Sequence, residues 1–170
     1  MDLGLDEINT IHIGFDDTDS IYGKCTTHLA FKITTHLFFD RNVQFIDYPL
    51  LVRLNPNVPW KTRGNAGVCI RIRSNQTSEI VEYIRNTILT ESAQDGDTNP
   101  GLAIFEGKVV PYQIKQFSTR AMYDVLSVEE AEELANSNNV NCIKFGNGRG
   151  IIGALASVGC TLEGDHTYEA

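Results

Sequence analysis

Apolar positions along the first two thirds of the chain follow two alternating periods, and each change of period predicts a change of secondary structure. Apolar runs rich in β-branched and aromatic residues are typical of strands, whereas apolar residues that recur every three or four positions predict one face of a helix. The predicted elements are a strand at 11–15, a helix from 26, strands at 43–54 and 66–72, a helix at 80–88 and a strand at 102–105. This order is that of the split βαβ unit in ferredoxin-like sandwiches.

The last third of the chain predicts further α/β structure. A capping box, Ser127-Val128-Glu129-Glu130, indicates the start of a short helix. Residues 109–114 and 141–145 favour strands, and a glycine-rich turn at 146–150 precedes an apolar helix at 151–158. We therefore expect an α+β fold in which a ferredoxin-like βαββαβ sandwich core carries an appended α/β segment. The expected division is an N-terminal extension at 1–10 and a domain at 11–170, with its core at 11–106 and the appended segment at 107–170.

Composition narrows the class of protein. With 170 residues, 42% of them hydrophobic, the chain can bury one substantial core. Its net charge of -8 gives no general attraction to phosphate backbones, so any nucleic-acid contact must be local. The four cysteines, Cys25, Cys69, Cys142 and Cys160, show no zinc or disulfide spacing, and no apolar run is long enough to span a membrane. We expect reduced thiols and a soluble, cytoplasmic protein without a membrane partner.

Three carboxylates directly follow the first predicted strand, in a segment at residues 16–20 that is here called the acidic loop. Asp16, Asp17 and Asp19 supply hard oxygen ligands that suit magnesium bound to nucleotide phosphates. The same residues also suit a turn or a helix cap, and spacing alone does not separate these interpretations. A phosphatase of the haloacid-dehalogenase type is a further alternative, because Asp17 and Asp19 form a DxD after an apolar strand. That motif expects Thr or Val where Ile21 stands, so we disfavour it.

A glycine-threonine segment at residues 23–27 (GKCTT) leads into the first predicted helix. Free N–H groups at a helix N-terminus can hold phosphate, and the lysine and hydroxyls here would assist. The segment is not a P-loop, because Gly23-Lys24 is followed by Cys25 and no glycine lies five residues before it. The structural alternative is that Thr26 or Thr27 only caps the helix.

A segment at residues 53–65, here called the cationic loop, lies at the end of the predicted strand at 43–54. No acidic residue occurs between Asp47 and Glu79, and this stretch holds five cations: Arg53, Lys61, Arg63, Arg71 and Arg73. Cations beside an acidic metal loop suit phosphoryl transfer, since both share the charge that develops on the phosphate oxygens. The alternative is a solvated surface loop with Trp60 packed beneath it.

Two further patterns carry less information. Gly148, Gly150 and Gly153 satisfy GxGxxG, but the chain ends before a dinucleotide-binding unit could close, so we expect at most phosphate or backbone contact there. The four histidines have no zinc-ligand spacing and are expected to be structural or surface residues.

Five motifs in this order resemble those of the archaeal tRNA agmatinylcytidine synthetases. They are GFDDTDS at 14–20, GKCTT at 23–27, RLNPNVPWKTRGN at 53–65, TNPG at 98–101 and GRGIIGALASVG at 148–159. The resemblance implies a ligase in which ATP activates the C2 carbonyl oxygen of the wobble cytidine of an isoleucine tRNA. The amine of agmatine then displaces the phosphate, and ATP ends as AMP and diphosphate.

The resemblance also implies roles for single residues in a kinase-like module named for its Thr, Cys, Lys and Asp positions. It makes Thr26 the threonine that becomes phosphorylated, and it makes Asp16, Asp17 and Lys61 catalytic. Magnesium would be held by Asp16, Asp17 and Asp19. The residues expected to bind ATP are Thr18, Ser20, Gly23, Cys25, Thr27, Arg63, Gly148, Arg149 and Gly150.

The chain departs from the family in its length. Family members continue into an oligonucleotide-binding fold and a zinc ribbon that hold tRNA, so we expect a truncated, isolated domain limited to ATP hydrolysis or autophosphorylation. Isoleucine tRNA would bind through those downstream domains, and agmatine would be the second substrate. The main rival hypothesis is a non-catalytic RNA-binding or assembly module, and a generic phosphohydrolase is the third. Thr26 separates the first two, because only phosphotransfer needs its hydroxyl.

Overall fold

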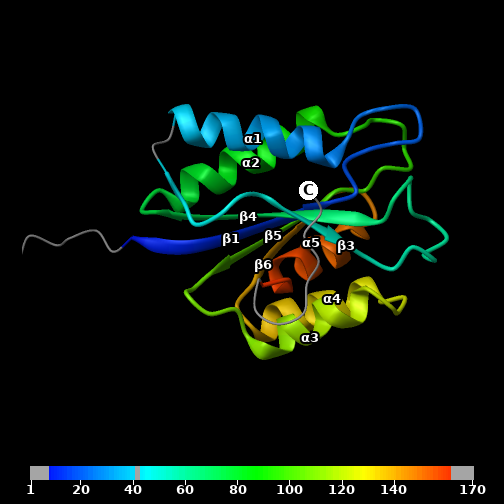
Figure 1. Ribbon diagram of the computed structural model, residues 1–170. Coiled ribbons are helices and arrows are strands. Elements are labelled where there is room, and N and C mark those ends of the chain that lie inside the picture. The colour runs from blue at the N-terminus through cyan, green and yellow to red at the C-terminus, as the bar shows by residue number, and fades with distance from the viewer. Residues whose placement is uncertain (1–7, 41–42, 162–170) are drawn as a thin grey trace, which may run out of the picture.

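A computed structural model describes residues 8–40 and 43–161 of the chain as an α+β fold. Its described strands form one six-stranded sheet with helices on both faces (Figure 1). The strands are β1 (Asn9–Asp16), β2 (Gln44–Phe45), β3 (Leu50–Arg53), β4 (Ala66–Ser74), β5 (Gly101–Glu106) and β6 (Asn141–Lys144). The helices are α1 (Thr26–Asp40), α2 (Thr77–Glu91), α3 (Tyr112–Ala121), α4 (Val128–Ser137) and α5 (Gly150–Gly159).

Strand β1 lies in the middle of the sheet. The strand order is β2-β4-β1-β5-β6, β3 also pairs with β4, and every pairing is antiparallel. Ile11, Ile13 and Phe15 of β1 are completely buried, because the strand has neighbours on both edges and helices on both faces. Asp16 ends β1 opposite Gly101 of β5. The acidic loop therefore leaves the sheet at its centre.

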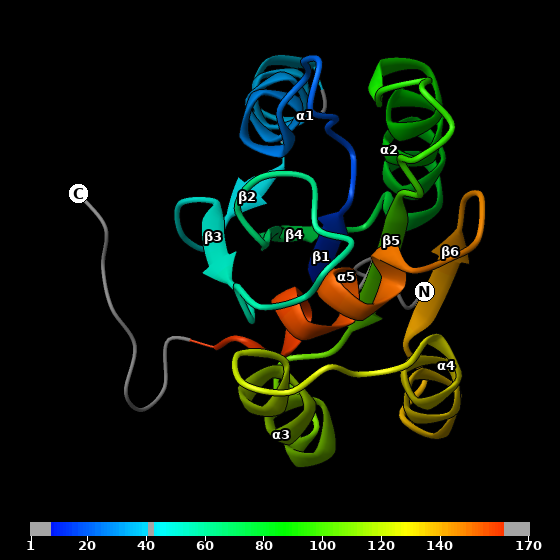
Figure 2. The same ribbon diagram turned by 90° about the vertical axis from the view of Figure 1, so that its right-hand side faces the viewer.

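Two helical layers enclose the sheet. Helices α1 and α2 cover one face, and α3, α4 and α5 lie on the other (Figure 2). The α2 face predicted from its period is buried, since Ile80, Ile84 and Ile88 are fully covered. On the opposite side, α5 is buried along almost its whole length between the sheet and α3 and α4.

Helix α5 sits unusually close to the sheet because three neighbouring strands each present a glycine to it. A Cβ atom at Gly14 of β1 would overlap the Ala154 carbonyl oxygen, and one at Gly101 of β5 would overlap the backbone of Gly150. At Gly67 of β4 it would overlap the side chain of Ser157. Only residues without a Cβ allow this approach.

Two predicted strands need correction. The strand predicted at 109–114 is wrong, because α3 begins at Tyr112 and its buried residues Ile114, Phe117 and Ala121 follow helical spacing. Two adjacent valines favoured a strand locally, but packing of this face against α5 decided the helix. The strand predicted at 43–54 is interrupted, since β2 and β3 pair with β4 separately, on either side of a bend.

The other predicted elements are confirmed, including the Ser127 cap, whose side chain accepts a hydrogen bond from the Glu130 N–H. The four cysteines are free thiols. No helix within the described residues is long and apolar enough to cross a membrane. The division at residue 106 stays a prediction; β6 and α5 of the later segment pack on the same sheet as the earlier one.

Candidate functional site

Loops from distant parts of the chain meet at one end of the sheet, on the right in Figure 1. They surround an open hollow whose empty space, open solvent included, is about 660 Å³. Its polar lining combines both charge signs and includes Asp16, Asp17, Asp19, Lys61 and Arg149. The structure thus brings the predicted acidic loop, the cationic loop and the start of α5 around one space.

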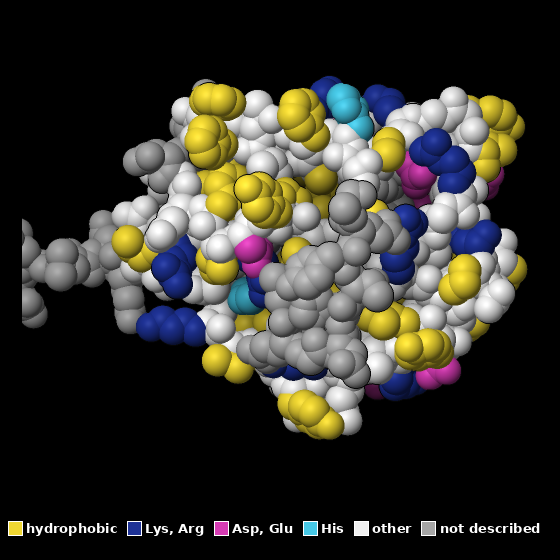
Figure 3. Space-filling model, viewed as in Figure 1, with side chains coloured by type: hydrophobic (Ala, Val, Ile, Leu, Met, Phe, Trp, Pro, Cys, Tyr) yellow, Lys and Arg dark blue, Asp and Glu magenta, His cyan; other side chains and the backbone are white. Residues whose placement is uncertain are grey.

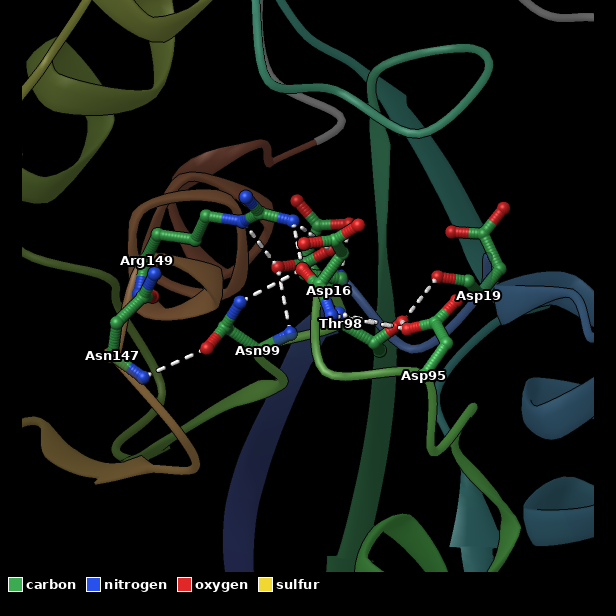
Figure 4. A network of polar contacts seen from close by, with 9 residues as sticks. Asp16, Asp19, Asp95, Thr98, Asn99, Asn147 and Arg149 are labelled. Atoms are coloured by element: carbon green, nitrogen blue, oxygen red, sulfur yellow. Dashed lines mark hydrogen bonds and ion pairs between the residues drawn. The ribbon is translucent and has the colours of Figure 1, made fainter. Parts of the chain in front are cut away.

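A polar network that includes Asn99, Asn147 and Arg149 lies beside this hollow (Figure 4). Asp17 is at its centre. Its carboxylate accepts hydrogen bonds from Arg149 Nε at 2.7 Å and Nη2 at 3.3 Å, and from the Asn99 N–H at 3.0 Å. Both partners of the ion pair are mostly buried, with side-chain exposures of 13% for Asp17 and 21% for Arg149. Asp17 has a left-handed backbone with φ 55°, which turns the chain out of β1.

Asp19 joins the acidic loop to the cationic loop. Its carboxylate accepts hydrogen bonds from Arg63 Nη2 at 2.9 Å and from Arg63 Nε at 3.2 Å. The same guanidinium donates to the Lys24 carbonyl oxygen at 2.6 Å. Arg63 therefore fixes the geometry between the two loops and is half-exposed at their junction.

Asp16 is held against α5. A Cβ at Gly153 would overlap the Asp16 carboxylate, so that helix residue leaves the space which the carboxylate fills. Burial raises the pKa of Asp16 to about 7, although the Asp17 N–H, which donates to Asp16 Oδ1 at 2.7 Å, works in the opposite direction. A carboxyl of this kind is poised to respond to a nearby cation.

The stability of the chain should depend on pH through Asp16. Its pKa rises on folding from an ordinary 3.8 to about 7, so its contribution to stability is fully present below about pH 4 and is lost as the pH rises through 7. In urea unfolding between pH 4 and pH 8, Asp16→Asn should remove this loss. As the pH rises from 4 to 8, the free energy of unfolding of the variant should therefore increase relative to that of the parent. A difference that does not change with pH would contradict the raised pKa of Asp16.

Asn99 connects the acidic loop to the glycine-rich turn. Its backbone N–H donates to Asp17, and its Oδ1 accepts from the Asn147 N–H at 2.8 Å (Figure 4). The Thr98 hydroxyl lies 3.0 Å from the Asp19 carbonyl oxygen. The sequence pattern contained these residues in the motif TNPG but assigned them no role. Their position in a loop rich in Asp, Asn and Gly was the only available signal.

Thr26, the predicted phosphate acceptor, does not line the hollow. It is 7% exposed at the start of α1, and its hydroxyl accepts a hydrogen bond from the Thr18 hydroxyl at 3.0 Å. Thr27 is exposed, with Oγ1 2.9 Å from Cys25 Sγ, and this hydrogen bond is the main cause of a lowered pKa for the Cys25 thiol. The other predicted nucleotide residues outside the lining are Thr18, Ser20, Gly23, Cys25, Thr27, Arg63 and Gly148.

The three aspartates do not form a cluster. Among residues 8–40 and 43–161, no three His, Cys, Asp or Glu side chains gather in a way that could hold a metal. Asp17 faces Arg149, Asp19 faces Arg63 and Asp16 faces α5. Magnesium usually needs only one or two carboxylates together with substrate phosphates, so the aspartates that line the hollow remain candidates.

Part of the lining of the hollow, between α3 and α4, was not predicted from the sequence. The last residue of α3 and the segment that follows it contribute Ala121, Asp124, Val125 and Leu126 to the lining. Asn55 ties this segment to the cationic loop, since its N–H donates to the Ala121 carbonyl at 2.8 Å and its Nδ2 to the Tyr123 carbonyl at 2.9 Å. No local pattern in 121–126 indicates a site.

The chain is similar to known proteins of one kind. Residues 12–77 match the TiaS TCKD domain family. The isoleucine-tRNA 2-agmatinylcytidine synthetase TiaS of Pyrococcus horikoshii is 41% identical over 163 residues, covering 94% of this chain and 37% of that protein. The protein of the same name from Archaeoglobus fulgidus is 37% identical over 161 residues, with the same two coverages.

Solved structures agree with the computed fold. A crystal structure of TiaS in complex with its isoleucine tRNA and ATP superposes with a TM-score of 0.84 at 35% identity, covering 92% of this chain and 37% of that chain. The complex of TiaS with the same tRNA, AMPCPP and agmatine gives a TM-score of 0.81 at 32% identity, with the same coverages. Both similarities are high enough to carry structural as well as family information.

The relatives that this chain matches are named as tRNA 2-agmatinylcytidine synthetases, a class of tRNA-modification proteins. The chain shares the fold of part of their solved structures. It spans about 37% of the length of the curated relatives it matches, within their N-terminal part. Within that class, residues 12–77 carry the TCKD domain of TiaS, and the chain is similar to the N-terminal part of the TiaS proteins.

Proposed function

We propose that this chain binds ATP in the hollow and supplies the phosphoryl-transfer step for attaching agmatine to the cytidine of an isoleucine tRNA. One observation carries the proposal: Asp16 and Asp17, Lys61, and Arg149, which come from three widely separated segments of the sequence, line a single hollow. ATP, an isoleucine tRNA and agmatine are named in the complexes of the solved relatives.

The charges of the hollow suit a polyphosphate. Lys61 and Arg149 are the cations that line it, and they would neutralise phosphate oxygens as negative charge shifts toward the leaving group. Asp16 and Asp17 would hold magnesium, whose hard-oxygen preference they match, and the buried Asp16 carboxyl would gain a countercharge. When bound, magnesium would supply positive charge that polarises the phosphates. Asp19 would support the site indirectly by holding Arg63.

Thr26 would accept the phosphoryl group in this proposal. In the transfer, a bond forms between Thr26 Oγ1 and the terminal phosphorus, the bond from that phosphorus to the bridging oxygen breaks so that ADP leaves with this oxygen, and the hydroxyl proton passes to solvent water. Because Thr26 is buried and bonded to Thr18, this contact must open before the hydroxyl can meet the phosphate. Slow turnover in the isolated chain is therefore expected.

Labelling with γ-³²P-ATP and magnesium tests this step. We expect label on Thr26, mapped by peptide sequencing, and loss of about 90% of it or more in Thr26→Val, because valine has nearly the same shape without the hydroxyl. Thr27→Val is the matched control, since Thr27 is the exposed neighbour and should be dispensable. Label that persists in Thr26→Val and disappears in Thr27→Val would contradict the assignment.

One observation favours a second candidate function. The burial of Thr26 also suits a module that binds nucleotide and RNA without phosphorylating itself. In that case ATP would bind with measurable heat in calorimetry, but neither threonine would become labelled. The combination of binding and labelling thus separates the two functions.

The tRNA and agmatine are proposed as substrates of the complete reaction. Lys and Arg side chains are visible around the loop end, on the right in Figure 3, where they could meet an RNA backbone. With a net charge of -8, the chain offers only this local attraction to a polyanion. We expect the isolated chain to form no agmatine-modified tRNA.

The strand order supports a ferredoxin-like classification for residues 11–106. In this proposal β1, the pair β2 and β3, β4 and β5 are the four strands of the βαββαβ unit, and α1 and α2 are its helices on one face. The antiparallel order β2-β4-β1-β5 is the order which that unit requires. Strand β6 and helix α5 would then extend the unit.

A further inference from the structure

The lining of the hollow contains two chemically different groups of side chains. The charged group, here called the charged wall, contains Asp16, Asp17, Asp19, Lys61, Asp124 and Arg149. The apolar group, here called the apolar wall, contains Leu54, Val58, Trp60, Val125 and Leu126, from the cationic loop and the segment after α3. A ligand that fits both walls needs an anionic part and a flat or apolar part.

Trp60 is the aromatic member of the apolar wall. It is the only tryptophan in the chain, and it is 50% exposed although it lines the hollow. Large aromatic side chains gain most from complete burial, so an indole left half-covered beside a polar site has surface available for a ligand. Neither hydrophobic core cluster includes it.

The loop that carries Trp60 is anchored on both sides. Asn65 Nδ2 donates to the Asn55 carbonyl oxygen at 2.9 Å, and the Leu54 N–H donates to the Asn65 carbonyl oxygen at 2.9 Å. Arg63 binds Asp19 across the site. These bonds hold the loop, and with it the indole, at the mouth of the hollow. A platform held in place in this way loses little conformational entropy when a planar ligand stacks on it.

We propose that Trp60 is a stacking platform for a nucleobase whose phosphates lie against the charged wall. This inference rests on the proposed function. It adds a role for the apolar wall, whose side chains carry no charge to bind phosphate. A nucleotide combines an aromatic face with an anionic tail, so it complements both walls at once. The base is either the adenine of ATP or a base of the RNA, and the two share the same stacking chemistry.

The single tryptophan makes the proposal directly measurable. Emission of Trp60 is followed while the chain is titrated with ATP and magnesium, with tripolyphosphate and magnesium, and with an RNA hairpin that has cytidine in its loop. We expect saturable quenching by ATP or by the hairpin and little change with tripolyphosphate, which carries the charge without a base. Calorimetry in parallel measures binding independently of the indole.

Variants test whether the stack contributes affinity. Trp60→Leu should weaken binding of the quenching ligand by about 5- to 150-fold, the range for a lost base–aromatic stack, whereas Trp60→Phe should retain most of it. Tyr48→Leu is the matched control, because Tyr48 is an exposed aromatic outside the hollow. Circular dichroism and thermal unfolding should be unchanged in all three variants.

The outcomes separate this inference from the proposed function. If ATP binds by calorimetry with no change in emission, and Trp60→Leu binds as tightly as the parent, only the stacking proposal is overturned. Equal quenching by tripolyphosphate also overturns it. Quenching by the hairpin alone supports the stack and assigns it to the RNA base. If neither ATP nor the hairpin binds, both the proposed function and the stacking proposal fail.

Discussion

Replacing Asp17 by asparagine is expected to abolish measurable ATP binding and to lower the free energy of unfolding by about 2 kcal/mol. The carboxylate accepts two hydrogen bonds from Arg149 and one from the Asn99 N–H in a mostly buried setting, and hydrogen bonds to charged groups contribute about 1.5 to 3 kcal/mol. Asparagine tolerates the left-handed backbone at φ 55°, so the loss would reflect charge and not strain. Calorimetric titration and urea unfolding measure the two effects.

A double-mutant cycle isolates the ion pair. Arg149→Met should destabilise the chain by a similar amount, and the double variant should lose much less than the two single losses together, since each change removes the same interaction. The control is the exposed pair Lys32–Glu91, 2.7 Å apart, where Lys32→Met and Glu91→Gln should show a coupling below about 1 kcal/mol. Equal coupling at both pairs would show that the Asp17–Arg149 contact has no special structural role.

Replacing Gly101 by alanine is expected to cost about 3 kcal/mol of stability and to weaken ATP binding at the same time. The new methyl group would overlap the backbone of Gly150 and Ile151, and a backbone cannot rotate away as a side chain can. Helix α5 would shift away from the sheet; it begins directly after Arg149 and carries Gly153, which faces Asp16. Thermal unfolding and ATP calorimetry are the two measurements.

Gly96→Ala separates crowding from backbone conformation. Gly96 has φ +85° but nothing within 4 Å of a new Cβ atom, so alanine there should cost only about 1 kcal/mol through backbone strain. Its effect on ATP binding should be small, since Gly96 does not line the hollow. If the Gly101 and Gly96 variants were equally stable, close packing of α5 would not be what positions the site.

Most of the secondary structure was predictable because it depends on neighbouring residues. The helical period at 80–88 and the capping box at Ser127 record local interactions that act within one or two turns, and both are confirmed. The helix α3 was not predictable in this way. The preceding Val109 and Val110 favour a strand locally, and only burial of Ile114 and Phe117 against the rest of the core selects the helix.

The types of residue in the candidate site were predictable from the sequence, but the contacts between their side chains were not. The sequence indicated an acidic loop and a cationic loop, and the structure places Asp16, Asp17, Asp19 and Lys61 around one hollow. Nothing in the sequence indicated that Asp17 pairs with Arg149, or that Thr26 is buried and hydrogen-bonded to Thr18. The metal and phosphate roles of these residues stay predictions until the experiments above are made.

By itself, the sequence determined the order of most elements, the motifs that mark the family, and the concentration of positive charge between Asp47 and Glu79. These features depend on local spacing or on composition, which a linear chain already contains. Tertiary structure alone decided which charges meet, since Asp17 and Arg149 are 132 positions apart and come together only when α5 packs onto the glycines of the sheet. Contacts at such separation depend on how whole elements pack, and that packing is a collective property of the folded core.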